Sequence, residues 1–354
     1  MKELVRNYKR IVIKIGASIF FNNSKLDYCH LNQIVASVSP LIEVDKREVI
    51  IVSSGAIALG MDLMKMDARP KSLPMLQAAA SIGQNILMDN YSRCFKAHKL
   101  NCAQVLLTWD DLDSRKRYLN AKHTLLALLK LGVVPIINEN DTVSTDEIKF
   151  GDNDTLSARV ASLACADLLV ILSDVDGLMD KDANVIPIVS EITPSIKQLA
   201  CPTDKKTCVG GMITKLDAAK IAVDSGIPCV IANGYKDGII SSVVNEPEKN
   251  GTLFVNKKRL AERERWIAFG TKPKGKINVD DGAKRAIIHR KSLLSVGING
   301  VEGNFEGKEI VSILDREGKE IARGKTLLSS RQIEKVAGLR SEKEVIHCDD
   351  MVIL

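Results

Sequence analysis

The chain has 354 residues, enough for about two domains, and 45% of its residues are hydrophobic while 27% are charged. This is the composition of a soluble globular protein, and no apolar run reaches the ~18 residues that a membrane span requires. The net charge of +6 suits an anionic ligand, whereas an aromatic content of 4% leaves few stacking platforms for nucleic acid.

The N-terminus and the cysteines indicate a cytoplasmic protein. The first residues lack the form of a signal peptide, and their short apolar run is typical of a first strand. The eight cysteines show no CxxC spacing, and most lie in apolar surroundings. We therefore expect reduced core thiols, with neither disulfides nor zinc ligands among them.

The first two predicted strands each lead into a small polar turn. Arg10 to Ile15 carries Lys14 within an apolar run, where an ammonium group needs a polar partner, and Gly16 follows. Glu48 to Val52 leads into Ser53-Ser54-Gly55 and an Ala-rich helical segment, so backbone N–H groups and a hydroxyl meet at a helix start, which favours an anion. Neither segment is a P-loop. Each is also typical of a lysine at a sheet edge or of an ordinary N-cap serine.

Polar residues crowd the end of a later predicted strand. Helices are predicted at Leu73 to Asn90 and at Tyr118 to Lys130, with a strand from Ala103 to Leu107 between them. The strand Val133 to Ile137 then runs into Asn138-Glu139-Asn140-Asp141. In an open α/β sheet, ligands bind beyond the carboxyl ends of strands.

A second polar cluster, Gly151 to Asp154, stands just before another helical pattern. Asn and Asp side chains can accept hydrogen bonds from an ammonium group, and Asn can donate to a carboxylate, so the two clusters together can recognise an amino acid. Either cluster alone is also typical of a turn or an N-cap. Their spacing of some ten residues, with Lys149 between them, favours a ligand site.

Two further segments have features of a nucleotide site. The predicted strand Leu168 to Leu172 ends in Ser173-Asp174-Val175-Asp176-Gly177, which is typical of a turn or of a ribose or base contact. Gly210-Gly211 opens a helical pattern with Lys215 in its first turn, and the strand Cys229 to Ala232 follows. Because a lysine there opposes the helix dipole, we expect a bound anion such as phosphate.

The composition changes after Lys257. Lys257 to Trp266 is a charged helical pattern, interpreted as a connector or a solvated helix face. Beyond it the chain becomes β-rich, with strands predicted at Lys276–Val279, Ile310–Leu314, Glu320–Arg323 and Glu344–His347. We expect an α/β domain over residues 1–256, a linker over 257–274 and a small β-rich domain over 275–354.

Taken together, the motifs resemble the amino acid kinase family, and in particular its members that phosphorylate L-glutamate. The resemblance is carried by Val12 to Gly16, Val52 to Ala58, Leu106 to Thr108, Arg117 to Ala121, Ile136 to Asp141, Glu147 to Asp154 and Gly210 to Lys215. The tail resembles a PUA domain, a module common in RNA-modifying proteins, at Val279 to Ile287, Ser292 to Leu294 and Gly303 to Phe305. The chain departs from the family pattern at Cys208-Val209, where Gly-Thr is usual, and at Lys291 and Ser295, where the family favours glycine and proline.

The resemblance implies a fold and an activity. The fold is a three-layer α/β/α sandwich with a mainly parallel sheet, followed by the PUA-like β-rich domain. The activity is ATP-dependent phosphorylation of the γ-carboxylate of L-glutamate to L-glutamyl 5-phosphate, the first step of proline biosynthesis, with Mg²⁺ bridging the β- and γ-phosphates. Proline is implied as a feedback inhibitor, glutamyl phosphate reductase as the recipient of the product, and a dimer or tetramer as the assembly, while the tail adds RNA as a candidate ligand.

The resemblance also implies roles for individual residues. Lys14 and Lys215 would clamp the transferred phosphoryl group, and Asp154, or alternatively Asp152, would hold the two ammonium groups. The glutamate ligands would be Ser54, Gly55, Asn138, Asp141 and Asn153, with Asp141 taking the α-ammonium group. The nucleotide ligands would be Lys14, Gly16, Ser173, Asp174, Val209, Gly210, Gly211, Met212, Ile213, Thr214 and Lys215. Backbone N–H groups at Gly16, Gly55 and Gly211 would contact phosphate or substrate oxygens, and no protein side chain is expected to ligate a metal.

A carboxylate with a pKa near ~4.3 is already ionised at neutral pH, so this reaction needs no general base, in keeping with motifs that contain no histidine. Two alternatives stay open. A kinase of the same family acting on N-acetylglutamate, aspartate or carbamate would share the nucleotide motifs, although residues 136–141 and the tail argue against it. The second alternative is an RNA-binding or RNA-modifying protein that acts through the tail. The low content of aromatic residues argues against it.

Overall fold

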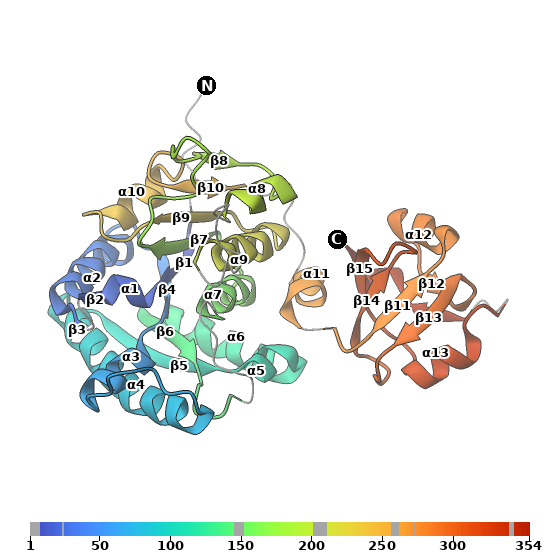
Figure 1. Cartoon of the computed structure of the whole chain (residues 1–354), viewed down its shortest axis with the longest axis horizontal. Helices are drawn as coiled ribbons and strands as arrows, with labels where there is room; N and C mark the ends of the chain where they lie inside the picture. Colours follow the sequence, from blue (N-terminus) through green and yellow to red (C-terminus); the bar gives the residue numbers. More distant parts are fainter. Residues whose placement is uncertain are drawn as a thin grey trace. The chain divides into compact units, whose positions relative to one another are not determined.

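The computed structural model describes residues 8–22, 25–144, 152–200, 211–255, 262–271, 273–339 and 343–354. The chain divides into two compact units, residues 1–259 and residues 260–354, drawn in blue to yellow and in orange to red in Figure 1. Within the described ranges, no helix is both long enough and apolar enough to cross a membrane.

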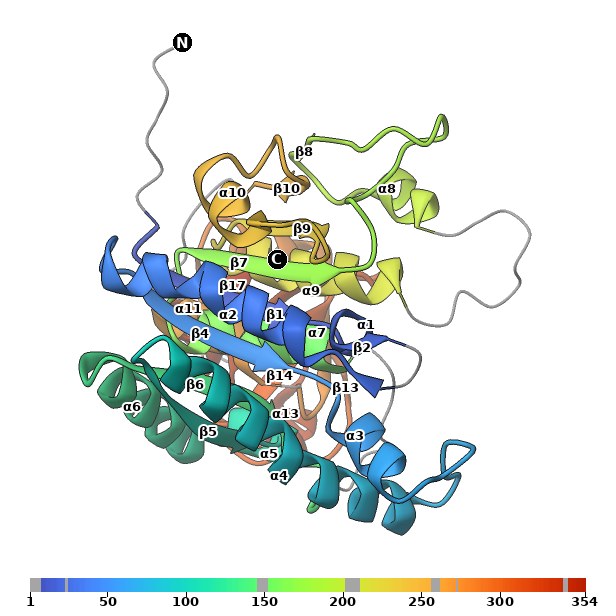
Figure 2. The same ribbon diagram turned by 90° about the vertical axis from the view of Figure 1, so that its left-hand side faces the viewer.

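An eight-stranded sheet forms the centre of the first unit, in the order β5–β6–β4–β1–β7–β9–β10–β8 (Figures 1 and 2). The strands are β1 (Arg10–Ile15), β4 (Glu48–Ser53), β5 (Asn101–Leu107), β6 (Val133–Glu139), β7 (Leu168–Ser173), β8 (Ile188–Val189), β9 (Cys229–Asn233) and β10 (Thr252–Phe254). All neighbours pair in parallel except β9 and β10, which are antiparallel. A small hairpin of β2 (Phe21–Asn22) and β3 (Lys25–Leu26) stands apart. The mainly parallel sheet implied by the family resemblance is confirmed.

Helices cover both faces of this sheet. They are α1 (Ala17–Phe20), α2 (Tyr28–Glu43), α3 (Ala56–Leu63), α4 (Leu73–Ala97), α5 (Trp109–Asp113), α6 (Arg115–Lys130), α7 (Asp152–Leu163), α8 (Pro194–Leu199), α9 (Met212–Asp224) and α10 (Ile239–Asn245). Apolar residues of α2, α4 and α10 form one core with the sheet, while α6, α7 and α9 pack on the other face (Figure 1). The two helices predicted from periodicity are present, and both extend beyond the predicted bounds.

The central strands are buried on both faces because their sequences are almost wholly apolar. Every residue of β7 is buried, as is every residue of β1 after Arg10. Lys14 is paired in register with Val52 of β4 and Ile171 of β7. The lysine therefore lies one residue from the carboxyl end of a central strand, with a parallel neighbour on each side.

Helices α3 and α4 touch through their backbones at two glycines. A Cβ at Gly83 of α4 would lie 1.7 Å from the carbonyl oxygen of Ala56, and a Cβ at Gly60 of α3 would lie 1.9 Å from that of Ala79. No side chain fits at such distances, so both positions require glycine. This contact holds the start of α3 against α4. It therefore also fixes the position of the turn between β4 and α3.

The second unit is β-rich, as predicted. Its five-stranded sheet has the order β13–β11–β14–β15–β17. The strands are β11 (Lys276–Val279), β13 (Ile298–Glu302), β14 (Ile310–Leu314), β15 (Glu320–Lys325) and β17 (Met351–Ile353), with β12 (Leu293–Leu294) and β16 (Glu344–Ile346) forming a separate pair. The helices are α11 (Glu262–Arg265), α12 (Asp281–Ile288) and α13 (Ser330–Val336), with a π-helical turn at Trp266–Gly270 and 3-10 turns at Ser295–Gly297 and Cys348–Asp350. Ile277, Phe305 and Ile313 are among the residues of a separate apolar core.

We predict that Gly83→Ala destabilises the first unit. The added methyl group would overlap the Ala56 carbonyl oxygen, and overpacking of this kind costs about 3 kcal/mol. At that cost Tm should fall by about 6 °C or more in a thermal scan. A control for the substitution type, placed in β13 of the second unit, is Gly300→Ala, whose Cβ would stand 3.8 Å from Asn278 Nδ2 and meet no backbone. Equal melting temperatures for the two variants would contradict a backbone contact between α3 and α4.

Candidate active site

A cavity of about 420 Å³ lies at the carboxyl ends of β1, β4, β6 and β7. It brings together the predicted residues Lys14, Gly16, Ser54, Gly55, Asn138, Asp141, Asn153, Asp154, Ser173, Asp174, Gly211, Thr214 and Lys215. These positions span some two hundred residues of sequence, yet they converge because parallel strands all end at the same edge of the sheet. The cavity therefore joins the predicted glutamate ligands to the predicted nucleotide ligands.

Several predicted residues do not line this cavity or lie outside the described part of the chain. Met212 and Ile213 belong to the first turn of α9 but are not among the lining residues. Val209 and Gly210 lie outside the described residues, and so does the side chain of Asp152. Sequence reasoning missed the lining residues Ala17, Ser18, Ala56, Ile57, Ala58, Arg69 and Glu139. Most of these continue motifs already recognised, whereas Arg69 stands in a segment that carries no motif.

One carboxylate lies between two buried lysines at the floor of the cavity. Lys14 Nζ of β1 lies 2.6 Å from Asp154 Oδ1, and Lys215 Nζ of α9 lies 3.7 Å from Asp154 Oδ2. The side chains of Lys14, Asp154 and Lys215 are 7%, 2% and 11% exposed. Thr214 Oγ1 donates a hydrogen bond of 2.7 Å to Asp154 Oδ2, and Lys215 Nζ donates to the Gly211 carbonyl oxygen at 3.2 Å. The structure thus assembles the cluster that the sequence motifs require, with Asp154 at its centre.

Burial and charge oppose each other in this cluster. Burial lowers the pKa of Lys14 below its ordinary value of 10.5; the Asp154 carboxylate opposes this shift and the Lys215 charge adds to it. Burial acts to raise the pKa of Asp154, but the charges of Lys14 and Lys215 and the hydrogen bonds from Lys14 and Thr214 outweigh it, so the pKa lies below its ordinary value. Asp154 is therefore a firmly ionised carboxylate that lies between two buried lysines.

The backbone at the start of α9 explains how Lys215 reaches this cluster. Gly211 precedes the helix with φ of +91° and ψ of −120°, a conformation that suits glycine alone. Lys215 follows one turn later, at a place where the helix dipole disfavours a cation. Asp154 and the Gly211 carbonyl oxygen offset that cost.

Gly16 leaves space beside Lys14. Its N–H donates to the Leu172 carbonyl oxygen at 3.4 Å, and the expectation that this N–H contacts phosphate stays a prediction. A Cβ at Gly16 would stand 3.5 Å from Lys14 Nζ. The missing side chain leaves the ammonium group of Lys14 open toward the cavity.

Amide and hydroxyl groups line a second part of the cavity, which we call the amide end. Asn153 Nδ2 lies 2.9 Å from Ser54 Oγ, 3.1 Å from Asn138 Oδ1 and 3.2 Å from the Ser53 carbonyl oxygen. Asn138 is 3% exposed, and Asp141 lines the cavity beside it. These groups come from β4, β6 and α7, and they form a connected polar surface that can recognise the donors and acceptors of an amino acid.

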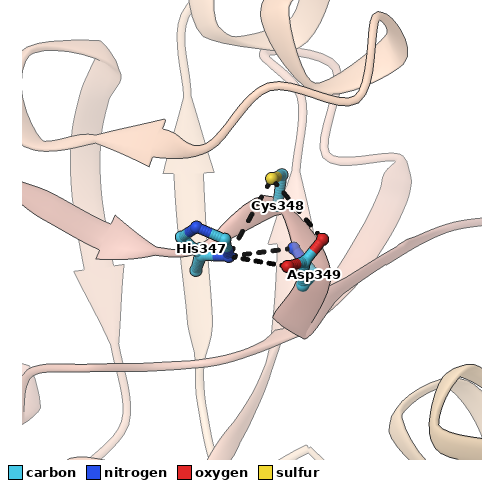
Figure 3. A group of neighbouring side chains, drawn as sticks. All are labelled: His347, Cys348 and Asp349. Atoms are coloured by element: carbon cyan, nitrogen blue, oxygen red, sulfur yellow. Dashed lines mark hydrogen bonds and ion pairs between the residues drawn. The ribbon is translucent and has the colours of Figure 1, made fainter.

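The second unit contains a group of potential metal ligands in the sequence His347-Cys348-Asp349 (Figure 3). Their ligand atoms lie within 4.8 Å of one another. His347 Nδ1 accepts a hydrogen bond of 3.2 Å from the Asp349 N–H, and Cys348 Sγ lies 3.9 Å from both His347 Nδ1 and Asp349 Oδ1. The ring nitrogen thus caps the 3-10 turn that follows. These are the contacts of a capped turn.

Family models agree with this geometry. Residues 9–233 match the amino acid kinase family, and residues 275–348 match the PUA domain. The chain therefore belongs to the amino acid kinase family, a class of phosphotransferases, and carries a PUA domain after its kinase domain.

Named relatives are more specific, and each is a glutamate 5-kinase. The enzyme of Thermoanaerobacter sp. (strain X514) is 43% identical over 98% of both chains. That of Carboxydothermus hydrogenoformans is 44% identical over 100% of both, and that of Dictyoglomus turgidum is 44% identical over 99% of this chain and 98% of its own. The resemblance drawn from the motifs is confirmed along the whole length.

We predict that Lys14 titrates below 10.5 and that Asp154→Asn lowers its pKa further, because the variant removes the negative charge that favours the ammonium form. Only the charged lysine can stabilise phosphate, so activity should fall as pH rises through this pKa, and at a lower pH in the variant. NMR of the chain labelled at lysine ¹³Cε, with the Lys14 signal assigned through Lys14→Arg, measures both values. An unchanged or higher pKa in Asp154→Asn would refute this account of the cluster.

Proposed function

We propose that this chain transfers the γ-phosphoryl group of ATP to the γ-carboxylate of L-glutamate, giving L-glutamyl 5-phosphate in proline biosynthesis. The observation that carries this proposal is the pair of buried lysines sharing Asp154, in a cavity that Asn138, Asp141 and Asn153 also line. Similarity to glutamate 5-kinases over nearly the full length supports the choice of substrate.

Charge is the main obstacle to this reaction. The attacking carboxylate and the γ-phosphate are both anions, and two unit charges 4 Å apart interact by about 4 kcal/mol at an effective dielectric constant of 20. Lys14 and Lys215 would place positive charge beside the transferred group, where negative charge spreads over its equatorial oxygens. Phosphoryl transfer needs little more from a protein than this stabilisation and the alignment of the reactants.

Asp154 acts by holding the lysines. Without a carboxylate between them, two ammonium groups in a buried site would repel each other and lose protons. Asp154 forms ion pairs with both lysines and accepts a hydrogen bond from Thr214, so the two ammonium groups would be held in place before substrate arrives. The substrate carboxylate arrives already ionised, and no general base is required.

The amide end would bind glutamate. Asp141 would take the α-ammonium group, with Asn138, Asn153 and Ser54 completing the set of polar contacts. Gly55, with φ of +107°, directs the chain into α3, so backbone N–H groups at that helix start face the cavity and favour a carboxylate. Proline carries an α-carboxylate and a secondary ammonium group in the corresponding positions, and we propose it as an inhibitor that competes for this end.

Ser173, Asp174 and the segment Gly211 to Lys215 would bind the nucleotide. Mg²⁺ is bound in kinases chiefly by phosphate oxygens and water with one or two carboxylates, and it neutralises part of the phosphate charge when bound. The donor set fits such an ion: the exposed Asp174 carboxylate stands at this end and accepts a hydrogen bond of 2.9 Å from Ser173 Oγ. Asp174 would hold the ion, since Asp154 is already occupied by two lysines. This proposal departs from the expectation that no protein side chain ligates the metal.

The product is an acyl phosphate, which hydrolyses readily, so we propose that a reductase receives it directly. This chemistry allows a direct test. With MgATP and L-glutamate, added hydroxylamine should trap the product as a hydroxamate, while N-acetyl-L-glutamate, L-aspartate and carbamate give little signal. A stronger signal with any of these three would assign the chain to another branch of the family.

We predict that Lys215→Ala lowers kcat for L-glutamate by about 100-fold or more, because it removes charge that stabilises the transition state. The matched control is Lys220→Ala on the same helix, since Lys220 is exposed, pairs with Asp224 and lies away from the cavity. Steady-state assays of both variants measure the difference. A kcat for Lys215→Ala within a few-fold of the control would remove Lys215 from the reaction.

A further inference from the structure

Helix α4 carries polar side chains at Gln77, Gln84 and Tyr91, spaced seven residues apart. Seven residues make nearly two turns, so the three side chains lie on one face of the helix, about 10.5 Å apart along its axis. Figure 2 shows α4 running beside β5 on one face of the sheet. This face of α4 contacts the end of β4, the end of β6 and the segment beyond β6.

Each of the three side chains makes one hydrogen bond to a different segment. Tyr91 OH donates to Ser53 Oγ at the end of β4 at 2.9 Å. Asn138 Nδ2, near the end of β6, donates to Gln84 Oε1 at 2.9 Å. Gln77 Nε2 donates to the carbonyl oxygen of Ser144, beyond β6, at 3.1 Å. One rigid helix thus holds the segments that supply Ser54, Asn138 and Asp141.

Two contacts favour the same orientation of the Asn138 amide, one with the N–H of Glu139 and one with Gln84. Asn138 Oδ1 accepts from the N–H of Glu139 at 2.9 Å and from Asn153 Nδ2 at 3.1 Å. A backbone N–H cannot reverse its polarity, so Oδ1 must face Glu139 and Nδ2 must face Gln84. Gln84 Oε1 is the acceptor that satisfies this buried Nδ2, and Gln84 Nε2 in turn donates to Gln104 Oε1 at 3.3 Å.

The orientation passes from Asn138 to Asn153. Because Asn138 offers an acceptor, Asn153 turns its Nδ2 toward Asn138 and Ser54. Its other amide atom, Oδ1, is buried and has no hydrogen-bond partner among the described residues. A buried acceptor without a hydrogen-bond partner lowers the stability of the fold. Because Asn153 lines the cavity, a ligand that brings a donor could satisfy this acceptor.

We propose that Gln84 is a positioning residue that makes the site selective for a substrate with an α-ammonium group. It acts through Asn138 to keep Asn153 Oδ1 presented as an acceptor beside Asp141. The inference rests on the proposed function, because it assumes that the amide end of the cavity receives glutamate. Gln84 itself lies outside the cavity lining, so its effect is on selectivity and not on the transferred phosphoryl group.

The test compares L-glutamate with glutarate, which has the same two carboxylates but no ammonium group. In Gln84→Leu, Asn138 Nδ2 loses its acceptor, and the N–H of Glu139 is then the one remaining contact that opposes reorientation of the Asn138 amide and, through it, of Asn153. The ratio of kcat/KM for L-glutamate to that for glutarate should fall about five- to tenfold, the range for one lost hydrogen bond. KM for MgATP should stay within about twofold, since the lysine cluster is untouched.

Three further variants separate positioning from damage to the fold. Gln84→Glu keeps an acceptor oxygen at the same reach and should restore most of the ratio. Gln84→Asn is too short to reach Asn138 and should lower the ratio even if Gln84→Leu does not fold. Asn85→Leu changes the adjacent, exposed residue of α4 and should leave the ratio unchanged.

The outcomes distinguish this inference from the proposed function. A ratio unchanged in Gln84→Leu and Gln84→Asn, or an equal loss for both substrates, overturns the role of Gln84 while the wild-type chain still forms glutamyl hydroxamate. A wild-type chain that forms no hydroxamate from L-glutamate overturns the proposed function, and the role of Gln84 with it. A selective loss for L-glutamate that Gln84→Glu reverses supports the positioning role.

Discussion

The site depends on one carboxylate shared by two ammonium groups. An uncompensated charge as deeply buried as that of Asp154 would cost several kcal/mol, and so would either lysine alone. Together they are tolerable, because Lys14 and Lys215 neutralise Asp154 while Thr214 satisfies a further lone pair. The three main partners come from β1, α7 and α9, so the ion cluster also fixes how these elements meet at the edge of the sheet. The net positive charge that is left over is what a phosphoryl group entering the cavity would meet.

The amide end depends on a different constraint. Neutral amide and hydroxyl groups can each donate or accept hydrogen bonds, so their orientation must be fixed by their neighbours. An amide can be reversed at little cost unless a group of fixed polarity decides its orientation. Here the Glu139 N–H decides it for Asn138, and the α4 face carrying Gln84 accepts the remaining donor. The backbone contact of α3 with α4 at Gly60 and Gly83 sets the neighbouring turn against the same helix. Helix α4 is thus the common frame of the amide end, whereas the ion cluster is anchored in the sheet and in the helices α7 and α9.

Much of this could be predicted from the sequence, for reasons that differ between elements. The central strands were predicted because long β-branched runs such as those of β1 and β7 have few other structures open to them. Lys14 and Lys215 were identified because a lysine in an apolar strand and a lysine in the first turn of a helix both require an anion. Helix α2 was not predicted: it carries Pro40 within its last turns, and its buried positions include several β-branched residues. Gln84 could not be recognised, because a glutamine on a long helix is ordinary until the fold shows which amide it meets.

A buried polar atom without a partner lowers the free energy of unfolding by about 1 to 3 kcal/mol relative to a satisfied one. Asn153 Oδ1 is such an atom, and the part of the chain that the structure describes offers it no donor. A smaller side chain there would remove the cost, but it would also remove the donor that links Asn138 to Ser54. A ligand that fills the cavity and brings a donor would satisfy this oxygen. In this view the free chain gives up stability at the amide end, and a ligand that carries an ammonium group restores it on binding.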